Sequence, residues 1–220
     1  MISLTEENYL KAIYSLNADS ALTASTNAIA EKMETKASSV SDMLKRLKEK
    51  KLINYKKYQA VTLTKDGEKI AVSIIRKHRL WEYFLVNHLK FGWEEVHEIA
   101  EQLEHIQSPK LTNKLEEFLD YPKFDPHGDP IPDRNGKFPI ELSDTLADCT
   151  KKQTVTVIGV KEDSVEFLRY LDQLSIQLGS QLTIDAINDF DQSMELTINQ
   201  TSKHHISQEV SKNLFIKIKA

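Results

Sequence analysis

The chain has 220 residues, of which 40% are hydrophobic and 28% charged, and its formal net charge is −4. Such a chain can bury a core and form one large or two small domains. Its apolar runs are only a few residues long and its N-terminus has no basic-then-apolar leader, so we expect no membrane span and a cytoplasmic location. The single cysteine, Cys149, excludes an internal disulfide and a cysteine-rich zinc site.

The first third of the chain has the pattern of a helix-turn-helix. Apolar residues at helical spacing predict a first helix over residues 5–16. Ser25 or Thr26 is expected to cap a short second helix, and after a polar break a third helix is expected over residues 37–50. Two short helices joined this tightly are typical of a helix-turn-helix.

Two short stretches rich in β-branched and aromatic residues predict a hairpin wing after these helices. They cover residues 53–57 and 61–64. Residues 36–57 contain eight Lys or Arg and only two acidic residues, a local charge of +6 in an acidic protein. Because DNA is a polyanion, this segment is the expected DNA interface.

The expected third helix has short polar side chains in its first two turns, which suit contact with a DNA groove. Lysines of the wing are expected on the phosphate backbone, although a lysine-rich turn also keeps a surface soluble. Asp42 either accepts a hydrogen bond from a cytosine amino group or caps the helix, and both roles stay open. The expected DNA-contacting residues are Ser38, Ser39, Ser41, Asp42, Lys45, Arg46, Lys56 and Lys57.

The middle third is predicted to be helical, and the last third to be a small β-domain. Helices are expected over residues 65–89, 93–106 and 108–119, and five prolines make residues 121–139 a turn-rich boundary. Short strands are expected at 154–160, 181–187, 194–198 and 214–218, with a small helix near 164–174. The expected domains are residues 1–64, 65–140 and 150–220, the last a small β-barrel.

Histidines and glutamates gather on one arc of the expected helix over residues 93–106. These residues are His97, Glu101, Glu104 and His105. Oxygen and nitrogen donors without a thiolate suit Mn²⁺, Fe²⁺ or Zn²⁺, and His78 and Glu82 on the preceding helix share a face that could meet His97. The alternative is a solvated charged face with incidental histidines.

Five motifs in this order carry a resemblance to a known family. They are E-N-Y-L-K-A-I-Y at residues 7–14, S-S-V-S-D-M-L-K-R-L at 38–47, R-K-H-R-L-W-E at 76–82, V-H-E-I-A-E-Q-L-E-H at 96–105 and D-P-H-G-D-P-I-P at 125–132. Over nearly its whole length, the chain resembles the diphtheria toxin repressor family of iron- and manganese-dependent regulators. The resemblance implies a mainly α fold with small β: an N-terminal winged helix-turn-helix, a helical dimerisation domain and a C-terminal SH3-like β-barrel.

The resemblance also implies two metal sites. His78, Glu82 and His97 match an ancillary site, to which Asp163 and Glu166 of the C-terminal domain are the best candidates for further ligands. Glu101, Glu104 and His105 match the primary, activating site together with Asn8 of the first helix. Family members usually have Met or Asp at the Asn8 position, so either the Asn8 carbonyl oxygen or a water is the expected ligand.

The ion favoured by this ligand set is Mn²⁺, with Fe²⁺ as the alternative. Iron-responsive members commonly have Cys where this chain has Glu101, and a harder ligand favours Mn²⁺. Lys11 stands where some manganese-specific members have Glu, which puts their closely spaced two-metal arrangement in doubt.

The expected function is therefore ion-dependent repression without enzymatic activity. A homodimer would place two recognition helices in successive major grooves of double-stranded operator DNA and repress metal-uptake genes when the ion is plentiful. One alternative is a winged-helix regulator that senses no metal. The other is a metalloenzyme, but the protease-like start at His97 lacks the second histidine, since Glu101 stands there.

Overall fold

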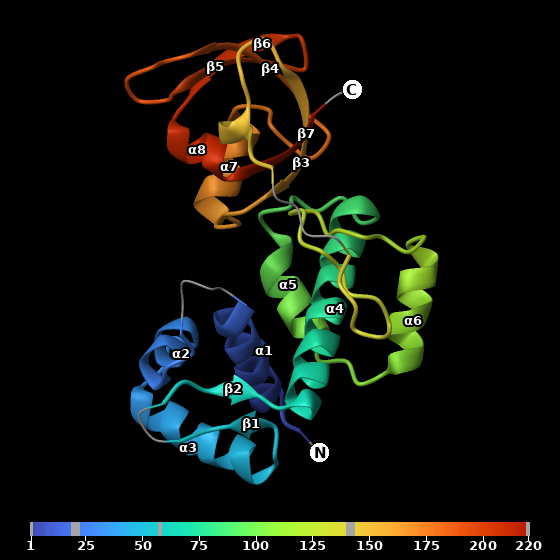
Figure 1. Ribbon diagram of the computed structural model, residues 1–220. Helices are drawn as coiled ribbons and strands as arrows, with labels where there is room; N and C mark the ends of the chain where they lie inside the picture. Colours follow the sequence, from blue (N-terminus) through green and yellow to red (C-terminus); the bar gives the residue numbers. More distant parts are fainter. Residues whose placement is uncertain (1, 19–22, 57–58, 140–143, 219–220) are drawn as a thin grey trace. The chain divides into compact units, whose positions relative to one another are not determined.

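The protein is described by a computed structural model that covers residues 2–18, 23–56, 59–139 and 144–218 (Figure 1). Its contacts divide the chain into two compact units. The first comprises Met1–His78, Gln102–Lys110 and Pro132–Lys137, and the second comprises Arg79–Glu101, Leu111–Ile131 and Phe138–Ala220. This division does not test the expected domain boundaries, residues 1–64, 65–140 and 150–220, which stay predictions.

The first unit begins with the expected helix-turn-helix. Its helices are α1 (Leu4–Ala18), α2 (Thr26–Lys32) and α3 (Ala37–Glu49). The Ser25 hydroxyl caps α2 by accepting a hydrogen bond from the Ala28 N–H at 3.1 Å. The fully buried core between α1 and α3 contains Leu10, Ile13, Leu44 and Leu47. The prediction of three helices close to these bounds is confirmed.

The wing is present but shorter than expected. Strands β1 (Ile53–Asn54) and β2 (Thr62–Leu63) pair antiparallel and have only two residues each. Ile53 and Val61 are buried, whereas Lys56 between them is exposed. The residues beyond the paired strands therefore offer little apolar surface that could stabilise a longer hairpin. Lys57, an expected DNA contact, lies outside the described residues.

The helical middle third is confirmed with one correction. Helices α4 (Lys65–Asn87) and α6 (Pro109–Phe118) agree closely with the prediction. Helix α5 (Val96–Leu103) is shorter than the expected 93–106, so Glu104 and His105 lie in a turn after it and the single helical arc of four ligands is wrong. Glu104 and His105 instead make tertiary contacts, Glu104 with Lys11 and His78 and His105 with Glu7.

The proline-rich segment is anchored on α4 within the second unit. The Arg79 guanidinium donates to the Pro130 carbonyl oxygen at 2.6 Å and to the Asp129 carboxylate at 2.7 Å. Ile131 is buried beside Leu80. The expected turns are therefore present, but residues 125–131 belong to a packed part of the fold and are not an open linker.

The C-terminal part is a five-stranded antiparallel sheet in the order β6-β5-β4-β3-β7 (Figure 1). Its strands are β3 (Thr154–Val160), β4 (Gln181–Ile187), β5 (Met194–Ile198), β6 (Ser202–Ile206) and β7 (Leu214–Ile218). They are accompanied by a short 3₁₀ turn (Leu146–Asp148), α7 (Val165–Gln173) and α8 (Gln208–Lys212). Four strands and α7 match the prediction, whereas β6 and α8 were not predicted because they contain few apolar residues.

In the part of the chain that the structure describes, no helix has the length and apolar character needed to cross a bilayer.

Candidate metal centres and DNA interface

Glu104 lies at the centre of a group of charged residues in the first unit, here called the Glu104 cluster: Glu7, Lys11, His78, Glu104 and His105. The Glu104 side chain is fully buried. The Lys11 ammonium of α1 lies 2.9 Å from each of its two carboxylate oxygens, and the Nδ1 atom of His78 lies 2.6 Å from Oε2. The carboxylate is thus held by side chains from two different helices.

These partners keep Glu104 ionised. Burial alone would raise the pKa of the Glu104 carboxyl, but the hydrogen bond from His78 and the charge of Lys11 outweigh it and hold the pKa below its ordinary value. Lys11 therefore supplies a positive charge beside Glu104, the carboxylate that is predicted to bind the activating ion.

A second contact joins α1 to the turn after α5. The buried carboxylate of Glu7 accepts a hydrogen bond from His105, with 2.6 Å between Oε2 and Nδ1, and a further one from Gln107. A carboxylate that holds one ring nitrogen of a histidine orients the other nitrogen toward a metal. Neither Glu7 nor this role was predicted, although Glu7 directly precedes the expected ligand Asn8.

The donors in this region fit a divalent ion. The side-chain carbonyl oxygen of Asn8 is buried and has no hydrogen-bond partner among the described residues, which is a costly state that an ion would relieve. The His105 Nε2 atom lies 3.8 Å from Glu104 Oε1. Glu101, the remaining expected ligand of this site, belongs to α5 in the second unit. Its side chain is 44% exposed and lies 3.7 Å from His97.

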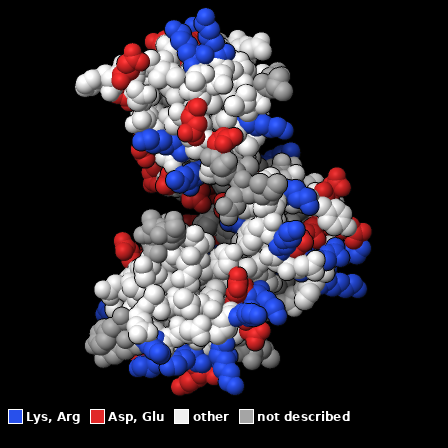
Figure 2. Space-filling view, viewed as in Figure 1, with Lys and Arg blue, Asp and Glu red and all other residues white. Residues whose placement is uncertain are grey.

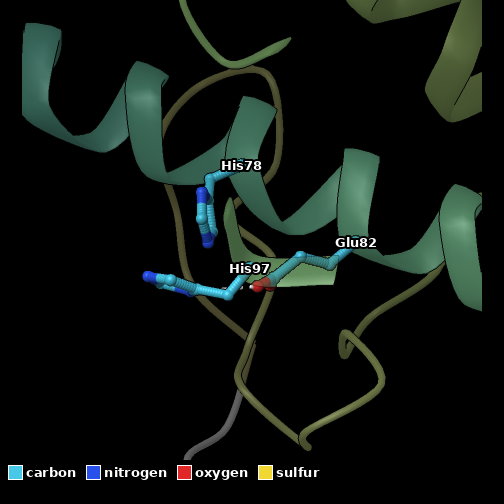
Figure 3. Close-up of side chains that lie close together, drawn as sticks. All are labelled: His78, Glu82 and His97. Carbon is cyan, nitrogen blue, oxygen red and sulfur yellow. Dashed lines mark ion pairs between the residues drawn. The ribbon is translucent and has the colours of Figure 1, made fainter. Parts of the chain in front are cut away.

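The expected ancillary ligands come together around Glu82 (Figure 3). His78 and Glu82 lie one turn apart on α4, and His97 of α5 approaches Glu82 at 3.4 Å. One donor atom from each of the three residues lies within 4.8 Å of the others. Glu82 is buried, whereas the His97 side chain is 56% exposed. This geometry is compatible with a metal site.

A third group, not predicted as a metal site, lies wholly in the second unit and is called the Glu82 cluster: Glu82, Asp125 and His127. All three residues are buried, with donor atoms within 4.8 Å of one another. The His127 Nδ1 atom lies 3.8 Å from Glu82 and 3.9 Å from Asp125. The opposite nitrogen, Nε2, lies 2.9 Å from the Trp93 carbonyl oxygen. Since a carbonyl only accepts, Nε2 carries a proton and Nδ1 faces the carboxylates.

Without an ion, the Glu82 cluster retains protons. Burial and the charges of Glu82 and Asp129 raise the pKa of Asp125 to about 8. Burial disfavours the charged form of His127, but Glu82 and Asp125 outweigh it and raise the pKa of His127 to about 10. The signal for this cluster was present in the motif D-P-H-G-D-P-I-P, whose Asp and His were not considered as ligands.

Gly128 positions the loop that carries Asp125 and His127. Its φ is +93°, and a Cβ atom there would lie 2.2 Å from the Gly159 Cα atom of β3. The Val160 N–H donates to the His127 carbonyl oxygen at 2.6 Å. Two glycines thus allow close contact between this loop and the C-terminal sheet.

Asp163 and Glu166 are exposed at the start of α7. Neither residue belongs to the ligand groups that the structure brings together among its described residues. Their role in the ancillary site stays a prediction.

Six of the expected DNA-contacting residues lie on α3, and all of them are exposed except Ser41, which is half-buried: Ser38, Ser39, Ser41, Asp42, Lys45 and Arg46. Lys56 is exposed after β1. Lysines and arginines gather over α3 and the hairpin in Figure 2. Asp42 pairs with Lys45 at 2.9 Å on this helix. Helix α3 begins at Ala37, and its N-cap residue is Lys36, so the capping role for Asp42 is wrong. Beside α3 is a hollow of about 430 Å³, lined by Lys45, Lys48, Glu49, Tyr55 and Lys56. Lys48 and Tyr55 were not predicted as contacts.

Three family models match successive parts of the chain. They are the iron dependent repressor N-terminal DNA binding domain over residues 1–61, the iron dependent repressor metal binding and dimerisation domain over 64–133, and the FeoA domain over 145–218.

Individual relatives agree with these models. The iron-dependent repressor IdeR of Mycobacterium tuberculosis (strain ATCC 25618 / H37Rv) is 34% identical over 128 residues, which are 58% of this chain and 55% of the relative. The chain therefore spans about half the length of these curated relatives. The diphtheria toxin repressor of Corynebacterium glutamicum is 26% identical over 196 residues, 84% of each protein.

Solved structures extend the match to almost the whole chain. A manganese-dependent transcriptional repressor in complex with manganese has a TM-score of 0.80 at 32% identity, over 97% of this chain and 100% of that one. The manganese regulator SloR has a TM-score of 0.72 at 34% identity, over 97% and 98%. The expected fold class is confirmed, and the chain belongs to the diphtheria toxin repressor family of iron- and manganese-dependent regulators.

Proposed function

We propose that this protein is a transcriptional repressor that binds double-stranded operator DNA as a homodimer when it is loaded with Mn²⁺, with Fe²⁺ as the alternative ion. Recognition helix α3 enters the major groove, and lysines of α3 and the wing contact phosphates. A protein that acts on chromosomal operators works in the cytoplasm. Two findings support this proposal: the chain belongs to the diphtheria toxin repressor family, and proteins similar to it are named as iron- or manganese-dependent repressors.

The observation that carries the proposal is the contribution of α1 to the Glu104 cluster. Helix α1 packs into the core of the DNA-binding domain, and it also brings Glu7 and Lys11 to His105 and Glu104. An ion bound by Glu104, His105 and Asn8 is then linked to the helix on which the DNA-binding domain is built. The ion favours the DNA-competent arrangement by binding it more tightly than the others.

The ion preference follows from the donor atoms. Carboxylate, amide and imidazole groups without a sulfur ligand suit Mn²⁺ and Fe²⁺ better than softer ions. The residues proposed to hold ions are Asn8, Glu101, Glu104 and His105 at the activating site, and His78, Glu82, His97, Asp125 and His127 at the others.

The test is operator binding followed by fluorescence anisotropy at fixed salt, since salt alone changes DNA affinity strongly. Chelated wild-type protein and the Glu104→Gln variant are titrated with Mn²⁺, Fe²⁺ under anaerobic conditions, Zn²⁺ and Mg²⁺. We expect tight binding by the wild type only with Mn²⁺ or Fe²⁺, and its loss in Glu104→Gln. The matched control is Glu98→Gln, an exposed glutamate of α5, which should behave as the wild type.

Binding by the wild type that is equally tight with and without all four ions would contradict the proposal and favour a metal-independent winged-helix regulator. Ion-dependent binding that survives in Glu104→Gln would contradict the assignment of the activating site alone.

A further inference from the structure

The first turn of α1 contains two adjacent glutamates whose carboxylates contact different parts of the first unit. Glu7 binds His105, as described above. Glu6 instead contacts Lys50, the residue that ends recognition helix α3. The Lys50 ammonium lies 2.7 Å and 2.8 Å from the two Glu6 oxygens, and Glu6 is only 5% exposed. One turn of helix therefore contacts both the metal-binding turn and the recognition helix.

The Glu6 carboxylate also orders the start of its own helix. It accepts a hydrogen bond from the Ser3 N–H at 2.8 Å, and the Ser3 hydroxyl accepts one from the Glu6 N–H at 3.3 Å, which forms a capping box. The start of α1 and the end of α3 thus share one buried carboxylate.

We propose that the Glu6–Lys50 ion pair transmits the state of the metal centre to the recognition helix. The inference rests on the proposed function, because it assumes that an ion binds at Glu104 and His105. Such an ion changes the partners available to Glu7 and Lys11, and both residues lie within two turns of Glu6 on α1.

The directional contact distinguishes this pair from the surrounding core. Apolar side chains such as Leu10 and Leu44 hold α1 and α3 together, but apolar contacts have little directional preference. A charge-assisted contact through two oxygens fixes the position of the Lys50 ammonium, and with it the end of α3. Glu6 is a positioning residue: it is buried and acts on DNA binding through Lys50.

The test compares the operator dissociation constants of chelated and Mn²⁺-loaded protein for the wild type, Glu6→Gln and Lys50→Gln. We expect the ratio of the two constants to fall about tenfold in either variant, within the range of ordinary allosteric coupling. The Mn²⁺ affinity of the free protein, measured by electron paramagnetic resonance, should stay within about twofold of the wild type, since neither residue belongs to the Glu104 cluster.

The matched control is Glu117→Gln, which removes an ion pair with Lys114 of 2.7 Å on α6 and should leave the ratio unchanged. The double variant Glu6→Lys/Lys50→Glu re-forms the pair with exchanged charges and should recover part of the ratio. If a single variant fails to fold, the double variant still tests whether the ion pair affects the ratio.

An unchanged ratio in a folded Glu6→Gln variant would overturn the inference and leave the proposed function intact. The inference would also be overturned if Lys50→Gln weakened chelated and loaded protein equally with a reduced salt dependence, because Lys50 would then be a phosphate contact only. Wild-type protein without any ion dependence would overturn the proposed function first.

Discussion

The Glu104 cluster and the Glu82 cluster both hold buried carboxylates beside histidines, but they balance the negative charge in different ways. In the Glu104 cluster, Lys11 and His78 hold Glu104 ionised. In the Glu82 cluster, protons remain on Asp125 and His127, because both pKa values are raised above neutral pH.

The two clusters should therefore respond to an ion in different ways. On the proposed assignment, a divalent ion that binds Glu104 would displace the Lys11 ammonium of α1. An ion that binds the Glu82 cluster would displace protons, which leave for the solvent. The first process would change the contacts of the DNA-binding domain, whereas the second would change mainly the dependence of ion affinity on pH.

The largest expected effect comes from Gly128→Ala, which should damage the Glu82 cluster alone. A Cβ atom at 2.2 Å from Gly159 Cα, together with a φ of +93°, strains the loop that carries Asp125 and His127. We expect a loss of about 2–4 kcal/mol in the free energy of unfolding, measured by thermal denaturation. Mn²⁺ binding at the Glu82 cluster should be lost as well. Equal stability of variant and wild type would show that the loop is free to move away from β3.

Lys11→Met should change ion binding at the Glu104 cluster. Removing the ammonium leaves the Glu104 carboxylate without its cation, so the ion no longer competes with a side chain. We expect tighter Mn²⁺ binding by roughly 10- to 100-fold and a less stable ion-free protein by about 2 kcal/mol, as for the loss of a hydrogen bond to a charged group.

Calorimetric Mn²⁺ titration and chemical denaturation measure these two effects of Lys11→Met. The control is Lys69→Met, because Lys69 is 81% exposed and lies 3.9 Å from Asp66. Weaker ion binding in Lys11→Met would show that Lys11 holds the site in shape and does not compete with the ion.

The pH dependence of ion binding should come from the Glu82 cluster. Asp125 is protonated below a pKa of about 8 and His127 below about 10, so the ion must release protons throughout the range from pH 6 to 8. Affinity should therefore rise with pH, by about tenfold per pH unit for each proton released. Glu104 contributes no proton in this range, because its pKa is lowered.

Calorimetry in buffers of different ionisation enthalpy counts the released protons, and Asp125→Asn should release fewer than the wild type. Binding enthalpies that do not depend on the buffer would contradict the assignment of protons to this cluster.

The sequence predicted the local elements well, because hydrophobic periodicity and caps such as Ser25 determine them. It also predicted Glu104 and His105 as ligands, which stays a prediction, but it placed them on a helix that ends at Leu103. Their partners Lys11, His78 and Glu7 are distant in sequence, so periodicity could not reveal these contacts. The Glu82 cluster was missed because Glu82 is 43 residues from Asp125 and 45 from His127 in sequence, and only tertiary packing brings them together. The pairing of Lys11 with Glu104 was missed for the same reason, since it joins residues 93 positions apart.

The smallest expected effect is optical and separates the two clusters directly. The Trp93 ring stacks on His127 with centroids 6.3 Å apart and planes inclined by 8°. In a Trp81→Phe background Trp93 is the remaining tryptophan, and paramagnetic Mn²⁺ in the Glu82 cluster should quench part of its fluorescence. Further replacement of His127 by Gln should abolish the quenching, whereas Glu104→Gln should preserve it. If Glu104→Gln abolished the quenching instead, ion binding at the Glu82 cluster would depend on the Glu104 cluster. The proposed difference, in which an ion displaces Lys11 in one cluster and protons in the other, would then be wrong.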